Sequence, residues 1–74
     1  MEDWQKRLID ECVDLYDKIL KLENFLDDYE NIKRVGDEVP LLRIQLDSMK
    51  AYYGVLEMRM AKHKICDKIL KEQK

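Results

Sequence analysis

The chain has little of the material from which most enzyme and nucleotide-binding folds are built. Its 74 residues include one proline, two glycines and one phenylalanine. So few glycines argue against the glycine-rich loops that cradle phosphates in dinucleotide-binding and P-loop proteins. So few turn-forming residues also argue against a sandwich of short strands. A chain of this length forms at most one domain, and so small a core usually needs a staple or a partner.

Cysteine is equally scarce, because Cys12 and Cys66 are the only two and lie far apart. Such a pair has neither the spacing of a zinc site nor the density of a disulfide framework, so we expect no metal and no cofactor. The first residues are charged and no apolar run follows them, which argues against a signal peptide. No apolar run is long enough to span a membrane. Together these features predict a cytoplasmic protein with reduced thiols.

Charge of one predominant sign is lacking as well. Charged residues make up 41% of the chain, acidic and basic residues are interleaved, and the net charge is -2. Proteins that bind polymeric nucleic acid normally carry a basic face, so that class is disfavoured. A small anionic ligand needs only a few cations and remains compatible with this balance. No nucleophile, base and orienting group occur in a familiar catalytic pattern, so we do not expect an enzyme.

What the sequence does contain is helical periodicity in two long segments. In the first segment, apolar residues recur at alternating steps of four and three, as Leu8, Cys12, Leu15, Ile19, Leu22 and Leu26. A second row runs one step beside the first and consists of Ile9, Val13, Tyr16 and Leu20. Asp3 is the expected cap at the start of this helix. The two rows together make an apolar face wider than an ordinary surface helix requires.

The rhythm is lost in the middle of the chain and then returns. Gly36 suits a turn, a single loose helical turn is expected at residues 31–34, and Pro40 suits the first turn of a new helix. Two helices with a short connector predict an all-α fold, a two-helix antiparallel hairpin with a short C-terminal helical tail. The predicted single helical-hairpin domain, residues 1–74, divides into a helix at 3–28, a connector at 29–39, a helix at 40–62 and a tail at 63–74.

The second helix has two apolar rows on nearly opposite sides. One row consists of Leu42, Leu46, Met49, Tyr53, Leu56 and Met60, and the other of Leu41, Ile44, Ser48, Ala51, Val55 and Met58. A hairpin covers only one row of each helix, and burial of each further Leu or Ile contributes ~1.5–3 kcal/mol. We therefore predict a homo-oligomeric helical bundle. A three-helix fold, in which the tail doubles back as a cover, is the competing arrangement.

Between these two rows lie three polar residues at intervals of seven, Gln45, Tyr52 and Arg59. An aromatic ring, a forked guanidinium and an amide are groups that could hold a small nucleotide in a groove between hairpins. The further candidate ligand-binding residues are Tyr53, Trp4, Lys6 and Arg7. The alternative is that the three are ordinary flanking positions of a coiled coil, and that Trp4 only packs against the end of the hairpin.

The order of these residues resembles a family of small phage proteins of the crAss-like phages. The resemblance covers residues 4 to about 60. In the first helix it rests on Arg7, Glu11, Leu15, Lys18, Leu22, Phe25 and Leu26. In the second helix it rests on Leu41, Leu42, Gln45, Leu46, Met49, Tyr52 or Tyr53, Leu56 and Arg59. This family is similar to the helical-hairpin domain of the phage sponge proteins that counter CBASS and Thoeris defence.

The resemblance implies both an assembly and a function. Sponge proteins are oligomers of helical hairpins, hexamers among them. They hold cyclic dinucleotides, cyclic trinucleotides or cyclic ADP-ribose derivatives between subunits without cleaving them. The resemblance therefore implies an anti-defence protein of the host cytosol that sequesters a cyclic nucleotide signal. The alternative is a structural or adaptor coiled coil that binds a partner protein through its second apolar row.

Overall fold

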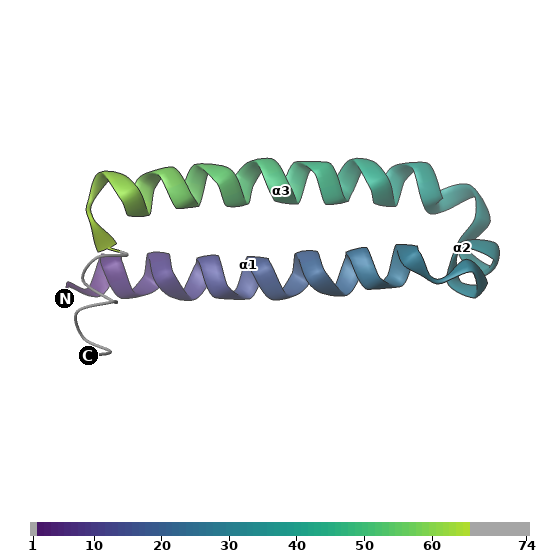
Figure 1. Ribbon diagram of the computed structural model, residues 1–74, viewed down its shortest axis with the longest axis horizontal. Helices are drawn as coiled ribbons and strands as arrows, with labels where there is room; N and C mark the ends of the chain where they lie inside the picture. Colours follow the sequence, from purple (N-terminus) through teal and green to yellow (C-terminus); the bar gives the residue numbers. More distant parts are fainter. Residues whose placement is uncertain (1, 66–74) are drawn as a thin grey trace.

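The computed structural model describes residues 2–65, and these form an all-α antiparallel hairpin. Its long arms are α1 (Asp3–Asp27) and α3 (Val39–Lys62), joined by α2 (Tyr29–Val35) and the 3-10 turn η1 (Gly36–Glu38). The two long helices run side by side, and α2 closes the end opposite the N-terminus (Figure 1). The predicted hairpin is therefore present. Most of the predicted tail, from residue 66 onward, lies outside the described residues.

A capping box, and not the expected Asp3 cap, begins α1. The N-cap residue is Glu2, and its backbone N–H donates to Oε1 of Gln5 at 3.1 Å. The arrangement satisfies backbone donors that the first turn of a helix leaves without partners. Asp3 lies within the first turn, where its negative charge interacts favourably with the helix dipole.

The connector is more regular than the loss of apolar rhythm indicates. Asp28 breaks α1 with an extended backbone, and its side chain accepts a hydrogen bond from the Glu30 N–H at 3.0 Å. That N-cap is sufficient to begin the seven-residue helix α2. The helix ends at Gly36, which has a φ of +50° that other residues adopt only with strain. Pro40 then lies in the first turn of α3.

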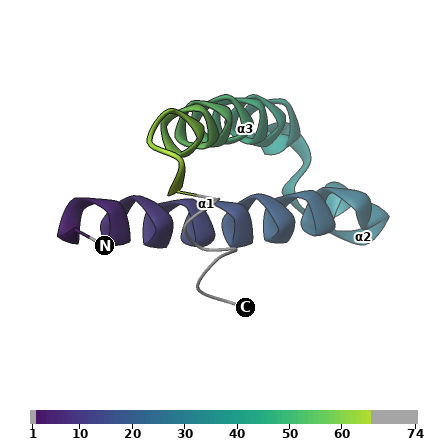
Figure 2. The ribbon, with the colours of Figure 1, turned by 60° about the vertical axis from the view of Figure 1, so that its left-hand side comes forward.

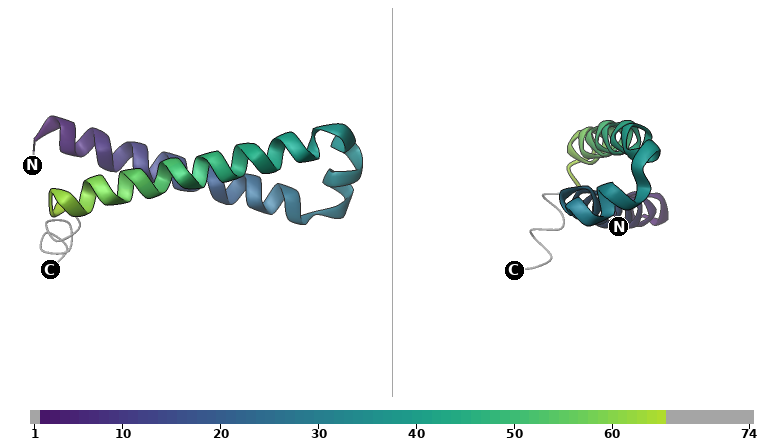
Figure 3. Two further views of the ribbon diagram at one scale, coloured as in Figure 1. Left: turned by 90° about the horizontal axis from the view of Figure 1, so that it is seen from above. Right: turned by 90° about the vertical axis from the view of Figure 1, so that its right-hand side faces the viewer.

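The hydrophobic core lies along the line where α1 and α3 touch. From α1 it includes Leu8, Cys12, Ile19 and Leu26, and from α3 Leu56 and Met60, with Ile65 just beyond. Leu56 and Ile65 are fully buried, so the tightest packing is near the open end of the hairpin. Seen from above, α3 crosses over α1, and the two helices diverge toward their ends (Figure 3). The row from Leu42 to Met60 is thus the face of α3 that packs on α1.

Both spare apolar rows are largely exposed, because α1 and α3 pack only on each other along their length among residues 2–65 (Figure 2). We call Ile9, Val13, Tyr16 and Leu20 the α1 strip. We call Leu41, Ile44, Ser48, Ala51, Val55 and Met58 the outer row. Val13 is 62% exposed and Met58 is 65% exposed. No helix among residues 2–65 is long and apolar enough to cross a membrane.

Candidate functional site

One face of the hairpin carries a polar pocket between α1 and α3. Its volume is about 360 Å³, and its lining residues are Arg7, Asp10, Glu11, Asp14, Leu15, Lys18 and Tyr52. We call this the Tyr52 pocket, because that residue alone reaches it from α3. The Tyr52 hydroxyl donates a hydrogen bond to Oε1 of Glu11. This contact joins the two helices at the pocket.

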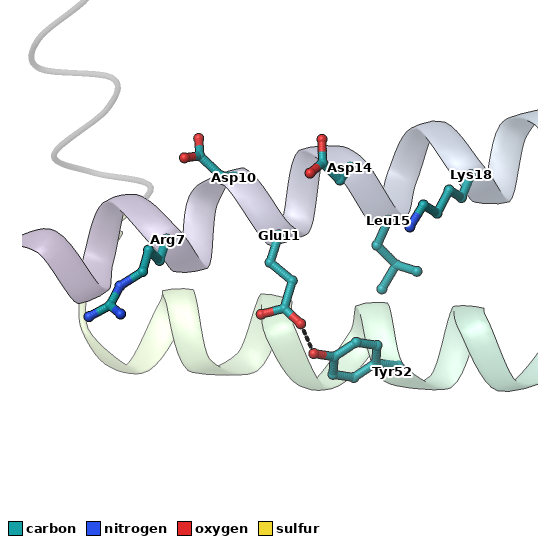
Figure 4. Close-up of a pocket in the computed structure, with 7 residues that line it drawn as sticks. All are labelled: Arg7, Asp10, Glu11, Asp14, Leu15, Lys18 and Tyr52. Atoms are coloured by element: carbon teal, nitrogen blue, oxygen red, sulfur yellow. Dashed lines mark hydrogen bonds between the residues drawn. The ribbon is translucent and has the colours of Figure 1, made fainter.

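The charges around the Tyr52 pocket do not all converge on it. Glu11, Leu15 and Arg7 extend toward α3, whereas Asp10 and Asp14 point away from it (Figure 4). Arg7 and Lys18 stand at the two ends of the lining, four and seven positions from Glu11 on the same edge of α1. The pocket therefore offers an aromatic ring, a carboxylate and two cations. Those groups suit a ligand that has both anionic groups and hydrogen-bond donors.

The register of the hairpin brings Arg59 to the same face. Glu11 bonds to Tyr52, and Trp4 touches His63, so residues between 4 and 11 of α1 lie level with residues between 52 and 63 of α3. Arg59 follows Tyr52 by seven residues, which is two helical turns or about 10 Å toward the open end. It is exposed, as is Arg7. Two guanidinium groups thus lie on the Tyr52 side of the hairpin near its open end.

Tyr53, another predicted site residue, lies on the opposite face. Its ring contacts Tyr16 with 5.7 Å between centroids, and both residues line an apolar hollow that also includes Val13. Burial is the main reason why the pKa of Tyr53 is raised above its ordinary value of 10.0, and the nearby Cys12 and Glu57 contribute. Tyr53 therefore cannot act together with Tyr52 on one ligand within a single chain.

Trp4 packs across the open end of the hairpin. Its ring meets His63 edge to face at a centroid distance of 4.8 Å, and Nε1 donates to Glu2 at 3.0 Å. This contact corresponds to the alternative given above, in which Trp4 packs against the end of the hairpin. Lys6 is exposed two residues further along α1. Neither Trp4 nor Lys6 lines the Tyr52 pocket.

Gln45 is exposed near the other end of α3 and lies two turns before Tyr52. Its Nε2 approaches Sδ of Met49 at 4.0 Å, a local contact within the helix. Of the seven predicted ligand-binding residues, the structure places Arg7 and Tyr52 in one pocket and Arg59 on the same side. Gln45 lies on that side as well but two turns away toward the connector, whereas Tyr53, Trp4 and Lys6 lie apart from the pocket.

The sequence analysis did not assign Glu11 or Lys18 to a site, although both line the Tyr52 pocket. The sequence feature that could have identified them is a polar edge of the first helix beside the core row. Its members recur at steps of four and three, as Arg7, Glu11, Asp14 and Lys18. Within residues 2–65, no group of three or more His, Cys, Asp or Glu side chains could hold a metal ion.

Comparison with known proteins places the chain in a described family. A protein-family model described as Sequestin matches residues 2–62, which include all of α1, α2 and α3. No curated protein matches the chain, and no solved structure matches it.

Proposed function

Because the chain belongs to the Sequestin family, we propose that it sequesters a small nucleotide signal by binding it without cleavage. The ligand class we propose is a cyclic di- or trinucleotide or a cyclic ADP-ribose derivative. The role is that of a phage anti-defence sponge, which lowers the free concentration of an immune signal in the host cytoplasm. The single observation that carries the proposal is the Tyr52 pocket, found within the span of the family match.

Each converging group of the Tyr52 pocket has a counterpart in a nucleotide. The guanidinium groups of Arg7 and Arg59 pair with phosphate oxygens, which they can bind through two hydrogen bonds each. Glu11 accepts from a ribose hydroxyl or a base N–H once the Tyr52 hydroxyl turns away. The Tyr52 ring stacks on a base, a contact worth about 1–3 kcal/mol. Lys18 supplies a further cation at the far end of the lining.

A single hairpin leaves the Tyr52 pocket shallow, so we propose that the sponge is a homo-oligomer. Tyr52 is 45% exposed, and the outer row next to it is exposed as well. A neighbouring hairpin would deepen the pocket and exclude water from the charged hydrogen bonds, which strengthens them. Coverage of the apolar rows by a second copy would also remove surface that otherwise favours aggregation.

The test is a thermal-shift screen against cyclic dinucleotides, cyclic trinucleotides and cyclic ADP-ribose isomers. A ligand at 100 times its dissociation constant should stabilise the fold by about 2.7 kcal/mol. The ligand should be recovered intact when the protein is denatured, because sequestration involves no turnover. If no nucleotide in the panel shifts the unfolding of a well-folded sample, the proposed ligand class is wrong.

Three substitutions locate the site, and one provides the control. Arg59→Ala and Arg7→Ala should each weaken binding about tenfold to a hundredfold, since a hydrogen bond to a charged group contributes about 1.5–3 kcal/mol. Tyr52→Phe retains the ring and should weaken binding much less. Arg43→Ala removes an exposed cation of α3 outside the pocket and should leave the affinity unchanged. Equal losses for Arg43→Ala and Arg59→Ala would mean that binding follows net charge and not this site.

A second candidate function is that of an adaptor coiled coil, and the exposed outer row favours it. Leu41, Ile44 and Met58 are each more than 60% exposed, and the six residues of the row follow strict heptad spacing. That spacing is typical of a helix that pairs with another helix. An adaptor would bind a helical partner protein with unchanged affinity when Arg7 and Arg59 are replaced, whereas a sponge would lose its ligand.

A further inference from the structure

The exposed face of α1 has apolar residues in the middle and opposite charges at its ends. Ile9, Val13, Tyr16 and Leu20 of the α1 strip are spaced by four, three and four. The same heptad pattern, extended by one step of three at each end, reaches Lys6 before Ile9 and Glu23 after Leu20. A cation thus begins the strip and an anion ends it.

We propose that a second copy of the chain docks on the α1 strip, so that two α1 helices pack antiparallel about a two-fold axis. The axis passes between Val13 and Tyr16, the midpoint of the strip. Each residue then faces the partner residue that lies at the same distance from the midpoint but on its other side. Val13 therefore meets the partner's Tyr16, and Ile9 meets the partner's Leu20. The inference rests on the proposed self-association and specifies the face and the direction of one of its contacts, while the contact that deepens the Tyr52 pocket is a separate one.

Charge complementarity selects the antiparallel direction. In that arrangement Lys6 of one copy faces Glu23 of the partner subunit, at both ends of the contact. A parallel pair would instead place Lys6 against Lys6 and Glu23 against Glu23, which is unfavourable for charges at a coiled-coil interface. The like-charged approach in the antiparallel pair is between Asp17 and the partner's Asp10, once at each end of the contact, and each Asp17 is already paired with Lys21 at 2.9 Å.

The packing of α3 on α1 places the same axis at Gly54. Tyr16 touches Tyr53, and Val13 lines a hollow with Tyr53, so the midpoint of the strip lies level with Tyr53 and Gly54. A glycine within a helix costs about 1 kcal/mol relative to alanine. Among residues 2–65 no packing contact requires it, because a Cβ at Gly54 would meet no atom within 4 Å beyond the local backbone of its own helix. A partner helix that approaches α3 closely at the axis supplies the missing reason.

Where the two-fold axis passes α3, charged residues of α3 are also placed so that opposite charges of the two copies face each other. Lys50 and Glu57 lie equally far on either side of the midpoint between Tyr53 and Gly54. Both belong to the face that bears the α1 strip, since Lys50 pairs with Glu23 at 3.4 Å and Glu57 lines a hollow with Tyr53. In the dimer, Lys50 faces the partner's Glu57. Each edge of the interface then carries a row of alternating charges. Glu23 contacts the partner's Lys6 and its own Lys50, and Lys50 in turn faces the partner's Glu57.

The dimer leaves the Tyr52 pocket open. Tyr53 and the α1 strip lie on one face of the hairpin, whereas Tyr52 and Glu11 lie on the other. The antiparallel contact therefore builds a four-helix unit with two Tyr52 pockets on its outside. The outer row remains exposed on each copy and available for further assembly.

Disulfide cross-linking tests the direction of pairing directly. Lys6→Cys and Glu23→Cys are each made in a chain that carries Cys66→Ser, and Cys12 is kept because it is buried. A mixture of the two variants should form a covalent dimer on mild oxidation. Neither variant should do so alone, because its two thiols would be about 25 Å apart along the antiparallel helices. The control mixture, Arg7→Cys with Lys21→Cys, samples the other side of α1 at a similar spacing and should stay uncross-linked.

Sedimentation of further variants tests the interface without new cysteines. Val13→Glu should raise the dissociation constant of the dimer at least a hundredfold, because it places two charges near the axis in an apolar contact. Gly54→Leu should raise it at least tenfold, although the added Cβ has open space in one hairpin. Val55→Glu, in the outer row, should leave the dimer intact. Helicity by circular dichroism should be unchanged in all three, since each position is exposed or open.

The outcomes separate this interface from the proposed function. Cross-linking of Lys6→Cys with itself, or an intact dimer in Val13→Glu, would overturn the antiparallel contact and leave self-association and ligand binding standing. A monomeric wild-type chain at about 100 µM would overturn both the contact and the proposed self-association. Ligand binding by the Val13→Glu monomer is measured separately in the thermal-shift screen, so its loss or retention bears on the sponge proposal alone.

Discussion

Two leucines of α3 provide the sharpest test of the packing, because they are chemically identical and differ only in burial. Leu56 has no exposed surface, whereas Leu41 is 66% exposed. Leu56→Ala removes packed atoms from the contact with Leu8 and Cys12 and leaves a cavity, which costs about 2–5 kcal/mol. Leu41→Ala removes little buried surface in a single hairpin and should change stability by less than about 0.5 kcal/mol.

The cost for Leu56→Ala is a large part of the total stability. A domain of this length has a free energy of unfolding of roughly 4–11 kcal/mol, at about 0.05–0.15 kcal/mol per residue. We therefore expect Leu56→Ala to unfold at a much lower urea concentration than the wild type, and Leu41→Ala to unfold like the wild type. Urea titrations followed by circular dichroism at 222 nm, at low and high protein concentration, measure both.

Equal losses for the two leucines at low protein concentration would refute the reasoning, since exposure in the hairpin would then not decide the cost. A cost for Leu41→Ala that appears only at high concentration has a different meaning. It would show that the outer row is covered in a larger assembly. The Leu56→Ala cost should be present at both concentrations, because it arises within one chain.

Three further predictions concern single contacts. Asp28→Ala removes the side chain that caps α2 through the Glu30 N–H and should cost about 0.5–2 kcal/mol, measured by urea unfolding. Because burial raises the pKa of Tyr53 above 10.0, the folded state holds the hydroxyl proton of Tyr53 more tightly than the unfolded state does. The stability of the fold should therefore fall as pH rises above about 10, and Tyr53→Phe should lessen that fall. His63→Ala removes the ring that packs edge to face on Trp4, the only tryptophan, and its fluorescence maximum should shift to longer wavelength; an unchanged spectrum would contradict this packing.

Much of the fold follows from periodicity. The row of Leu8, Cys12, Ile19 and Leu26 is buried in α1, and the row that ends in Leu56 and Met60 faces it from α3. Steps of four and three place residues on one side of a helix whatever its surroundings, so the core rows can be read from the chain. The helix in the connector was predicted only as a loose turn at residues 31–34 and is longer, because its start depends on the Asp28 cap and it has no buried apolar residue.

The candidate site was predictable only in part. The Tyr52 edge of α3 was identified from its position between two apolar rows. Its partner Glu11 was not, because a contact across 41 positions of sequence depends on how far one helix is shifted along the other. Tyr52 and Tyr53 are adjacent in the chain, yet a step of about 100° per residue sends one ring to each face of the hairpin.

The sequence by itself determined that the chain is helical, where its long helices begin and end within a few residues, and that each long helix has more apolar rows than one hairpin covers. Local propensity and helical spacing suffice for these features. Only the tertiary structure decided that Arg7 and Glu11 join Tyr52, and that the α1 strip lies on the other face beside Gly54. The reason is physical: helical spacing fixes directions around one axis, whereas the pairing of two surfaces requires their mutual register, which arises when the side chains of the core interlock.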